Sequence, residues 1–178
     1  KRIGWNARAQ EGAVDGWYQT KFTLKEEPLV SILIPNKDHT DDLDVCLNSF
    51  FERADYQNYE FIIIENNSVL PETFAYYEKI EKEHDNVKVV YWEAGFNYSA
   101  INNFGFKFAK GDYIMLLNND VELITPDIFQ SMLGFCMRPE VGIVGAKLLY
   151  NDHTVQHAGV LVGAGGLADH VFKGIHED

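Results

Sequence analysis

Long apolar runs and cysteines are scarce in this sequence of 178 residues. No apolar run approaches the ~20 residues that a membrane-spanning helix needs. The best candidate, Ala158 to Ala168, is short and contains four glycines. We therefore expect no transmembrane segment in this chain. The two cysteines, Cys46 and Cys136, are too few for a disulfide framework. Reduced thiols indicate a cytoplasmic protein, with peripheral attachment to the inner membrane face as an option.

Basic residues are also scarce, since 15 Lys and Arg stand against 27 Asp and Glu, giving a formal charge of −12. This balance argues against binding nucleic acid or an anionic membrane through a broad basic face. An anionic ligand would then need a local positive charge at its site, such as a metal ion. The sequence also lacks a P-loop motif, a G-x-G-x-x-G motif between a strand and a helix, and a Ser-His-Asp elbow. Neither a P-loop nor a classical dinucleotide site is therefore present, and nothing indicates a serine hydrolase.

What the chain does contain is enough apolar surface to fold, since 46% of its residues are hydrophobic and 13% are aromatic. Its length suits one domain. The chain begins at Lys1 and its last residues do not look like a natural ending, so we expect a fragment of a longer protein. We expect residues 1–28 to be an irregular lead-in segment and residues 29–178 to form the functional domain.

Short buried strands alternate with amphipathic helices after residue 28. The first helix begins near Thr40 and carries its apolar residues at i, i+3, i+4, i+7 and i+8. A later helix begins at Thr125, with Pro126 at its first position. This alternation predicts an α/β fold with a mostly parallel sheet and right-handed crossovers. The predicted strands are residues 30–34, 61–64, 87–91 and 113–117, and further helices lie near 72–83 and 101–108.

Three polar clusters follow predicted strands. They are Asn36-Lys37-Asp38, Glu65-Asn66-Asn67 and Asn118-Asn119-Asp120. Ligands of open parallel sheets bind at the carboxyl ends of the strands, near the point where the strand order reverses. One such cluster would be an ordinary loop, but three at one edge predict a ligand site.

Several segments together resemble family 2 glycosyltransferases. The segments are Val30 to Pro35, Glu60 to Ser68, and Gly111 to Asp120. Two further segments, Phe96 to Asn103 and Val155 to Val160, are similar to the bacterial O-antigen and rhamnan-type branch of that family. In this order and spacing the motifs are fairly specific.

The resemblance covers about Leu29 to Gly174, and it implies a GT-A fold of the Rossmann-like type. It implies a nucleoside-diphosphate sugar donor linked to UDP or dTDP, a saccharide or lipid-linked acceptor, and transfer with inversion. It also implies a divalent metal, Mn²⁺ or Mg²⁺, and a role in cell-surface polysaccharide synthesis. An oxygen-ligated metal would offset the repulsion between the diphosphate and a protein with a net charge of −12.

The resemblance assigns roles to individual residues. Glu65 matches the position that accepts a hydrogen bond from the pyrimidine ring, Asp120 matches the last carboxylate of the D-x-D element that holds the metal, and His170 is expected to complete the metal shell. The other expected contacts to the nucleotide sugar are Pro35, Asn36, Lys37, Asp38, Asn67, Asn102, Asn103, Asn118 and Asn119.

The sequence departs from the family pattern at two positions. Asn118 replaces the first acid of D-x-D, with Glu122 as a candidate helper, and Lys37 stands where many members carry an aromatic ring. The general base for inversion has only Asp169 and Asp178 as weak candidates, and the resemblance implies that it lies beyond residue 178.

Two alternatives stay open at this stage. The stronger one is a degenerate transferase domain that binds sugar nucleotides or partners without catalysis. It is favoured because Asn118 stands where D-x-D has its first acid. A sugar nucleotidyltransferase is disfavoured, because residues 36–40 contain neither the Gly nor the Arg that such a loop would carry.

Overall fold

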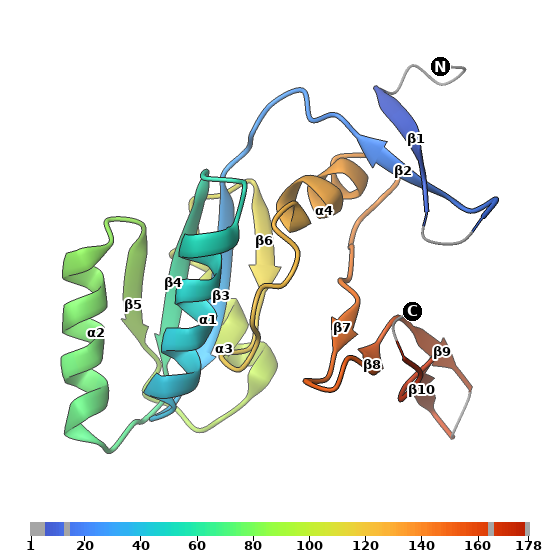
Figure 1. Ribbon diagram of the computed structural model, residues 1–178. Coiled ribbons are helices and arrows are strands. Elements are labelled where there is room, and N and C mark those ends of the chain that lie inside the picture. The colour runs from blue at the N-terminus through green and yellow to red at the C-terminus, as the bar shows by residue number, and fades with distance from the viewer. Residues whose placement is uncertain (1–5, 13–14, 164–165, 177–178) are drawn as a thin grey trace. The chain divides into compact units, whose positions relative to one another are not determined.

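The computed structural model of the chain describes residues 6–12, 15–163 and 166–176. The chain folds into two compact units, shown in Figure 1. One unit is Lys25–Ile128, and the other combines Lys1–Leu24 with Phe129–Asp178. These units differ from the expected division into a lead-in segment 1–28 and a domain 29–178. That residues 29–178 form the functional domain stays a prediction.

A four-stranded parallel sheet forms the centre of the unit Lys25–Ile128, in the order β5-β4-β3-β6. Its strands are β3 (Val30–Asn36), β4 (Tyr59–Glu65), β5 (Val87–Tyr91) and β6 (Tyr113–Leu116). The chain builds outward from β3 to β4 and β5, and then returns to place β6 on the other side of β3 (Figure 1). The strand order therefore reverses between β3 and β6, which is where open α/β sheets bind ligands. The predicted parallel α/β fold is confirmed.

Three helices connect these strands: α1 (Thr40–Arg53), α2 (Pro71–Glu83) and α3 (Tyr98–Phe106). The predicted apolar stripe of α1 is buried against the sheet. The Asn97 side chain caps α3 by accepting a hydrogen bond from the backbone N–H of Ala100. In the described parts of the chain, every helix is too short or too polar to cross a membrane.

The core lies between the sheet and these helices. The central residues of β3 and β4 are buried without alternation, as expected for parallel strands that are covered on both faces. Helix α3 approaches the sheet closely at Gly105, where an added Cβ would overlap the side chain of Ile64. Glycine, which has no Cβ, therefore fits this position of α3.

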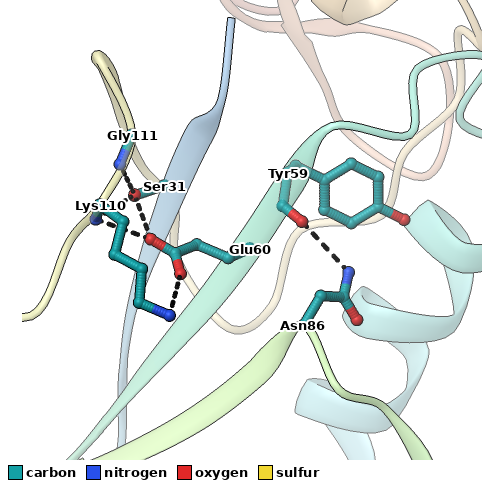
Figure 2. A network of polar contacts seen from close by, with 6 residues as sticks. All are labelled: Ser31, Tyr59, Glu60, Asn86, Lys110 and Gly111. Atoms are coloured by element: carbon teal, nitrogen blue, oxygen red, sulfur yellow. Dashed lines mark hydrogen bonds and ion pairs between the residues drawn. The ribbon is translucent and has the colours of Figure 1, made fainter.

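A polar network ties the amino-terminal edge of the sheet to the loop before β6 (Figure 2). The Glu60 carboxylate accepts hydrogen bonds from Ser31 Oγ at 2.7 Å and from the Lys110 backbone N–H at 2.8 Å. Ser31 Oγ in turn accepts a hydrogen bond from the Gly111 N–H at 2.8 Å. This network lies at the opposite edge from the three polar clusters, so its role is to hold the fold.

Gly111→Ala should destabilise the protein by about 1–3 kcal/mol, the usual range for overpacking. An added Cβ would lie 2.5 Å from the Leu29 carbonyl oxygen and 2.7 Å from the Ser31 nitrogen, and backbone atoms cannot move aside cheaply. Chemical denaturation measures the effect. The matched control is Gly95→Ala, where no atom lies within 4 Å of the added carbon. Equal stability of the two variants would contradict this account.

In its described residues, the other unit contains short antiparallel strand pairs and one helix. Strand β1 pairs with β2, β7 with β8, and β9 with β10. The sequence predicted that residues 1–28 are irregular. The described part of this segment instead contains the β1–β2 pair. The strands are β1 (Ala7–Glu11), β2 (Tyr18–Phe22), β7 (Leu148–Leu149), β8 (Val155–His157), β9 (Val160–Val162) and β10 (Ala168–His170).

Helix α4 (Ile128–Cys136) begins later than the sequence predicted. The expected start at Pro126 is wrong, because residues up to Asp127 form a turn in which Ile128 N–H donates to the Thr125 carbonyl at 3.2 Å. The Pro126 carbonyl accepts a hydrogen bond from Asp55 N–H at 3.1 Å instead of from a helical N–H. A contact that is distant in sequence therefore delays the helix.

Candidate functional site

The structure brings the three polar clusters together at the carboxyl edge of the sheet. Asn119 Nδ2 after β6 donates to Asn36 Oδ1 at the end of β3, at 2.7 Å. Asn36 Nδ2 donates to the Tyr77 hydroxyl of α2 at 2.8 Å, and that hydroxyl donates to Glu65 Oε2 at 2.9 Å. Asn36 and Glu65 are each only 3% exposed. One chain of hydrogen bonds thus links the ends of β6, β3 and β4.

The Glu65 carboxylate is buried and accepts three hydrogen bonds from within the protein. Its partners are the backbone N–H of Ser68, the hydroxyl of Ser68 and the hydroxyl of Tyr77. Burial raises the pKa of the Tyr77 hydroxyl well above its usual range, and the negative charge of Glu65 adds to this effect. Tyr77 therefore remains a donor. A carboxylate has about four acceptor positions, so one position of Glu65 has no donor among the described residues.

Asp38 joins the loop after β3 to the start of α2. It has a φ of 59°, a conformation that Asp tolerates better than most residues. Its carboxylate accepts hydrogen bonds from Val69 N–H at 2.9 Å, Leu70 N–H at 3.0 Å and Thr73 Oγ1 at 3.2 Å. The Leu70 N–H is the main cause that holds the pKa of Asp38 below its ordinary value of 3.8. The Asp38 side chain therefore holds two loops together.

Asp38→Asn should lower the melting temperature at neutral pH, because an amide cannot accept all of these hydrogen bonds as well as a carboxylate does. A depressed folded pKa stabilises the fold above the unfolded value of 3.8. That stabilisation is lost as the pH falls through the folded pKa, so the gap between the variant and the parent should close in acid. Thermal melts from pH 7 to pH 3 measure it.

Asp85→Asn is the matched control for Asp38→Asn, because Asp85 is exposed in the turn after α2. The control should melt like the parent at every pH. A gap between Asp38→Asn and the parent that stayed constant down to pH 3 would show that the charge of Asp38 contributes nothing.

The remaining predicted residues of the first two clusters lie at the surface of this edge. Lys37 and Asn67 are exposed, and Pro35 is half-buried. Asn67 Nδ2 donates to the Ala94 carbonyl at 2.9 Å, and Asn66 Nδ2 donates to the same carbonyl at 3.3 Å. The loop before α3 is therefore anchored to the loop after β4.

Asn102 and Asn103, predicted near the start of α3, differ in environment. Asn103 is exposed, whereas Asn102 is 6% exposed and donates from Nδ2 to the Tyr98 carbonyl at 2.9 Å. Within the described residues, Asn102 Oδ1 is buried without a hydrogen-bond partner. An unpaired buried acceptor costs roughly 1–3 kcal/mol, so a donor from water or a ligand would stabilise it.

The cluster after β6 turns its middle residue inward and its outer residues to solvent. Asn119 is bound to Asn36, while Asn118 and Asp120 are exposed. Among the described residues, the Asp120 carboxylate has no hydrogen-bond or ion-pair partner. Glu122, the candidate helper, instead forms an ion pair with Arg53 at 2.7 Å. The cluster therefore presents one uncommitted carboxylate.

This arrangement fits Mn²⁺ or Mg²⁺, which prefer oxygen ligands and bind through one or two carboxylates together with phosphates. No group of three or more His, Cys, Asp or Glu side chains in the described residues is placed to hold a metal. Most ligands of an ion at Asp120 would therefore come from the diphosphate and water.

His170, the other predicted metal ligand, lies on β10 in the second unit. Its Nδ1 atom is 2.8 Å from Nδ1 of His157 on β8, and the two rings are nearly perpendicular at 83°. One ring nitrogen of His170 is thus engaged. Asp169 is exposed and accepts a hydrogen bond from the His170 N–H, while Asp178 lies outside the described residues.

Sequence reasoning missed two residues of this site, Tyr77 and Ser68. The sequence pattern indicates no role for Tyr77 and includes Ser68 only as the end of the segment Glu60 to Ser68. A tyrosine on the buried face of a helix, facing strands that end in Asn and Glu, is the signal that could have revealed the shared network.

Comparison with known proteins identifies the family. The sequence model described as "Glycosyl transferase family 2" matches residues 31–160. The chain belongs to glycosyltransferase family 2. It is 40% identical over 159 residues to the uncharacterized protein y4gI of Sinorhizobium fredii and 41% identical over 155 residues to the O-antigen biosynthesis protein RfbC of Myxococcus xanthus.

These alignments cover 89% and 87% of this family 2 chain, which spans only 18% and 12% of the two relatives. A mannosyltransferase from Pyrobaculum calidifontis, in complex with GDP-Man and Mn²⁺, has a similar fold, with a TM-score of 0.60 at 16% identity over 66% of this chain and 35% of that one. TarS 1-349 of S. aureus gives a TM-score of 0.52 at 20% identity over 61% and 32%. The predicted GT-A-like fold is confirmed.

Proposed function

We propose that this domain takes part in transferring a sugar from a nucleoside-diphosphate donor to a saccharide or lipid-linked acceptor, with inversion, in cell-surface polysaccharide synthesis. The chain of hydrogen bonds from Asn119 through Asn36 and Tyr77 to Glu65 carries this proposal. These four side chains, which we call the polar floor, form a fixed polar surface at the switch point of the sheet in a family 2 glycosyltransferase.

Asp120 is the proposed metal ligand, because it is the exposed carboxylate beside this floor. A bound Mn²⁺ or Mg²⁺ would stabilise the charge that develops on the departing diphosphate. Asn118 can add an amide oxygen, and the exposed Lys37 can offset phosphate charge. His170 stays a proposed ligand, and Nε2 is its available atom because Nδ1 contacts His157. The Mn²⁺ in the similar mannosyltransferase supports a metal in this role.

The proposed donor is linked to UDP or dTDP, with Glu65 accepting a hydrogen bond from the pyrimidine ring at its remaining acceptor position. Similar structures contain GDP-Man in one case and UDP-GlcNAc, in TarS, in another, so the base must be tested directly. The unpaired oxygen of Asn102 can accept from a hydroxyl of the donor. The free thiols of Cys46 and Cys136 support a cytoplasmic location.

Release of nucleoside diphosphate from UDP-, dTDP- and GDP-sugars, with and without Mn²⁺, tests the function. In the full-length protein we expect Mn²⁺-dependent release from a pyrimidine-linked donor, stimulated by a saccharide acceptor. This chain alone should bind the donor and transfer sugar poorly or not at all, because its general base is expected beyond residue 178. The loss of an acid at Asn118 favours a second candidate, a domain that binds donor without catalysis. Mn²⁺-dependent binding with no release, in the full-length protein as well, would support that candidate.

A further inference from the structure

We propose that α1 positions the metal-binding loop after β6 through three residues on one face: Cys46, Ser49 and Arg53. The inference rests on the proposed metal role of Asp120. The three residues are spaced i, i+3 and i+7, so they lie in one row along the helix. We call the loop 118–123 the metal loop. Cys46 contacts its beginning, and Ser49 and Arg53 contact its end.

Ser49 connects the middle of α1 to the end of the metal loop. Its hydroxyl accepts a hydrogen bond from the Leu123 backbone N–H at 2.9 Å and donates one to the Cys46 carbonyl at 2.7 Å. Ser49 is buried, at 3% exposed. Since Ala cannot accept a hydrogen bond, Ser49→Ala would leave the Leu123 N–H buried without this partner.

Arg53 holds the same end of the metal loop from the last turn of α1. Its Nη1 donates to the Leu123 carbonyl at 2.8 Å and lies 2.7 Å from Glu122 Oε1. The guanidinium therefore fixes both a backbone carbonyl and a side chain. Because the Arg53–Glu122 pair is about half exposed, its contribution to global stability is small, whereas its contribution to loop geometry is direct.

Cys46 lies beneath the beginning of the metal loop. Its side chain is fully buried, and its Sγ donates weakly to the Asn118 carbonyl at 3.9 Å. Cys46 therefore supports the backbone of the metal loop at Asn118.

These contacts fix the backbone of the metal loop while leaving the Asp120 carboxylate exposed. The Asn119–Asn36 hydrogen bond holds the middle of the loop, and α1 holds both ends. A ligand that is ordered before binding avoids the entropic cost of ordering it afterwards. Partners that orient a metal ligand typically contribute 10- to 100-fold to metal affinity. Cys46, Ser49 and Arg53 should raise the metal affinity of Asp120 by a similar factor.

The test measures Mn²⁺ binding by electron paramagnetic resonance, in one series with UDP and in a parallel series with dTDP. Ser49→Ala and Arg53→Ala should each weaken Mn²⁺ affinity roughly tenfold to a hundredfold. Arg53→Lys should recover part of the loss, because Lys retains the charge that faces Glu122. Asn48→Ala is the matched control, since Asn48 lies on the same helix but bonds to Asp44 instead of the loop.

A purely structural role predicts a different result. The variants would then melt earlier while the folded protein kept the parent's Mn²⁺ affinity, and this result would overturn the inference. If Ser49→Ala fails to fold, Arg53→Ala carries the test alone, because its ion pair is about half exposed and its loss should leave the protein folded. Asp120→Asn separates the two claims. If it leaves Mn²⁺ affinity unchanged, the proposed function fails. If it abolishes binding while the α1 variants bind normally, only this inference fails.

Discussion

Asp120→Asn should remove the metal-dependent part of nucleotide binding. An amide has the same shape as a carboxylate but lacks the charge that a hard divalent ion requires. Because even outer-sphere partners contribute 10- to 100-fold to metal affinity, losing the ligand itself should weaken Mn²⁺ binding by at least roughly a hundredfold. Titration of UDP and dTDP with and without Mn²⁺ measures the loss.

The fold should survive Asp120→Asn, because the side chain is exposed and makes no hydrogen bond within the described residues. The melting temperature should therefore match that of the parent. Asp112→Asn is the control, since Asp112 is also exposed but precedes β6, at the opposite end of the same strand. An Asp120→Asn variant that binds nucleotide and Mn²⁺ like the parent would refute the metal assignment.

Glu65→Gln should weaken nucleotide binding and blur the preference for pyrimidine over purine diphosphates. A hydrogen bond to a charged group contributes roughly 1.5–3 kcal/mol, which corresponds to about tenfold to a hundredfold in affinity. Glutamine is a better test than alanine, because alanine would leave the hydroxyls of Tyr77 and Ser68 without their acceptor. A competition assay with UDP, dTDP, GDP and ADP measures the preference.

Tyr77→Phe separates base reading from support of the network. It removes the hydroxyl that links Asn36 to Glu65 but leaves the Glu65 carboxylate charged. If Glu65 contacts the base, Tyr77→Phe should retain more of the pyrimidine preference than Glu65→Gln does. An unchanged preference in a well-folded Glu65→Gln variant would show that other residues read the base.

The sequence was sufficient to predict the parallel sheet and the edge at which the polar clusters meet. The short apolar run Ile32 to Ile34, which ends at Pro35, favours a buried strand. Because the carboxyl ends of parallel strands meet at one edge, Asn36, Glu65 and Asn118 are placed together there. These inferences need only local pattern and topology. The parallel pairing of four strands and the meeting of the three clusters at one edge followed from them, whereas the order β5-β4-β3-β6 came from the structure.

The partners of individual polar atoms could not be predicted, because they depend on contacts between residues far apart in sequence. Periodicity placed Cys46 on the buried face of α1, but not beside the Asn118 carbonyl. Pro126 is a good helix start by local rules, yet its carbonyl binds Asp55 N–H and the helix begins later. The β1 strand was missed because all of its residues are exposed, so no alternation of apolar and polar residues marks it.

Calorimetric titration of the parent chain with UDP, dTDP, GDP and ADP, each with and without Mn²⁺, tests the central claim most directly. The account predicts saturable binding of a pyrimidine diphosphate that strengthens when Mn²⁺ is added, with weaker binding of the purine diphosphates. Binding of none of the four in the presence of Mn²⁺, or binding whose affinity is the same without the metal, would contradict it.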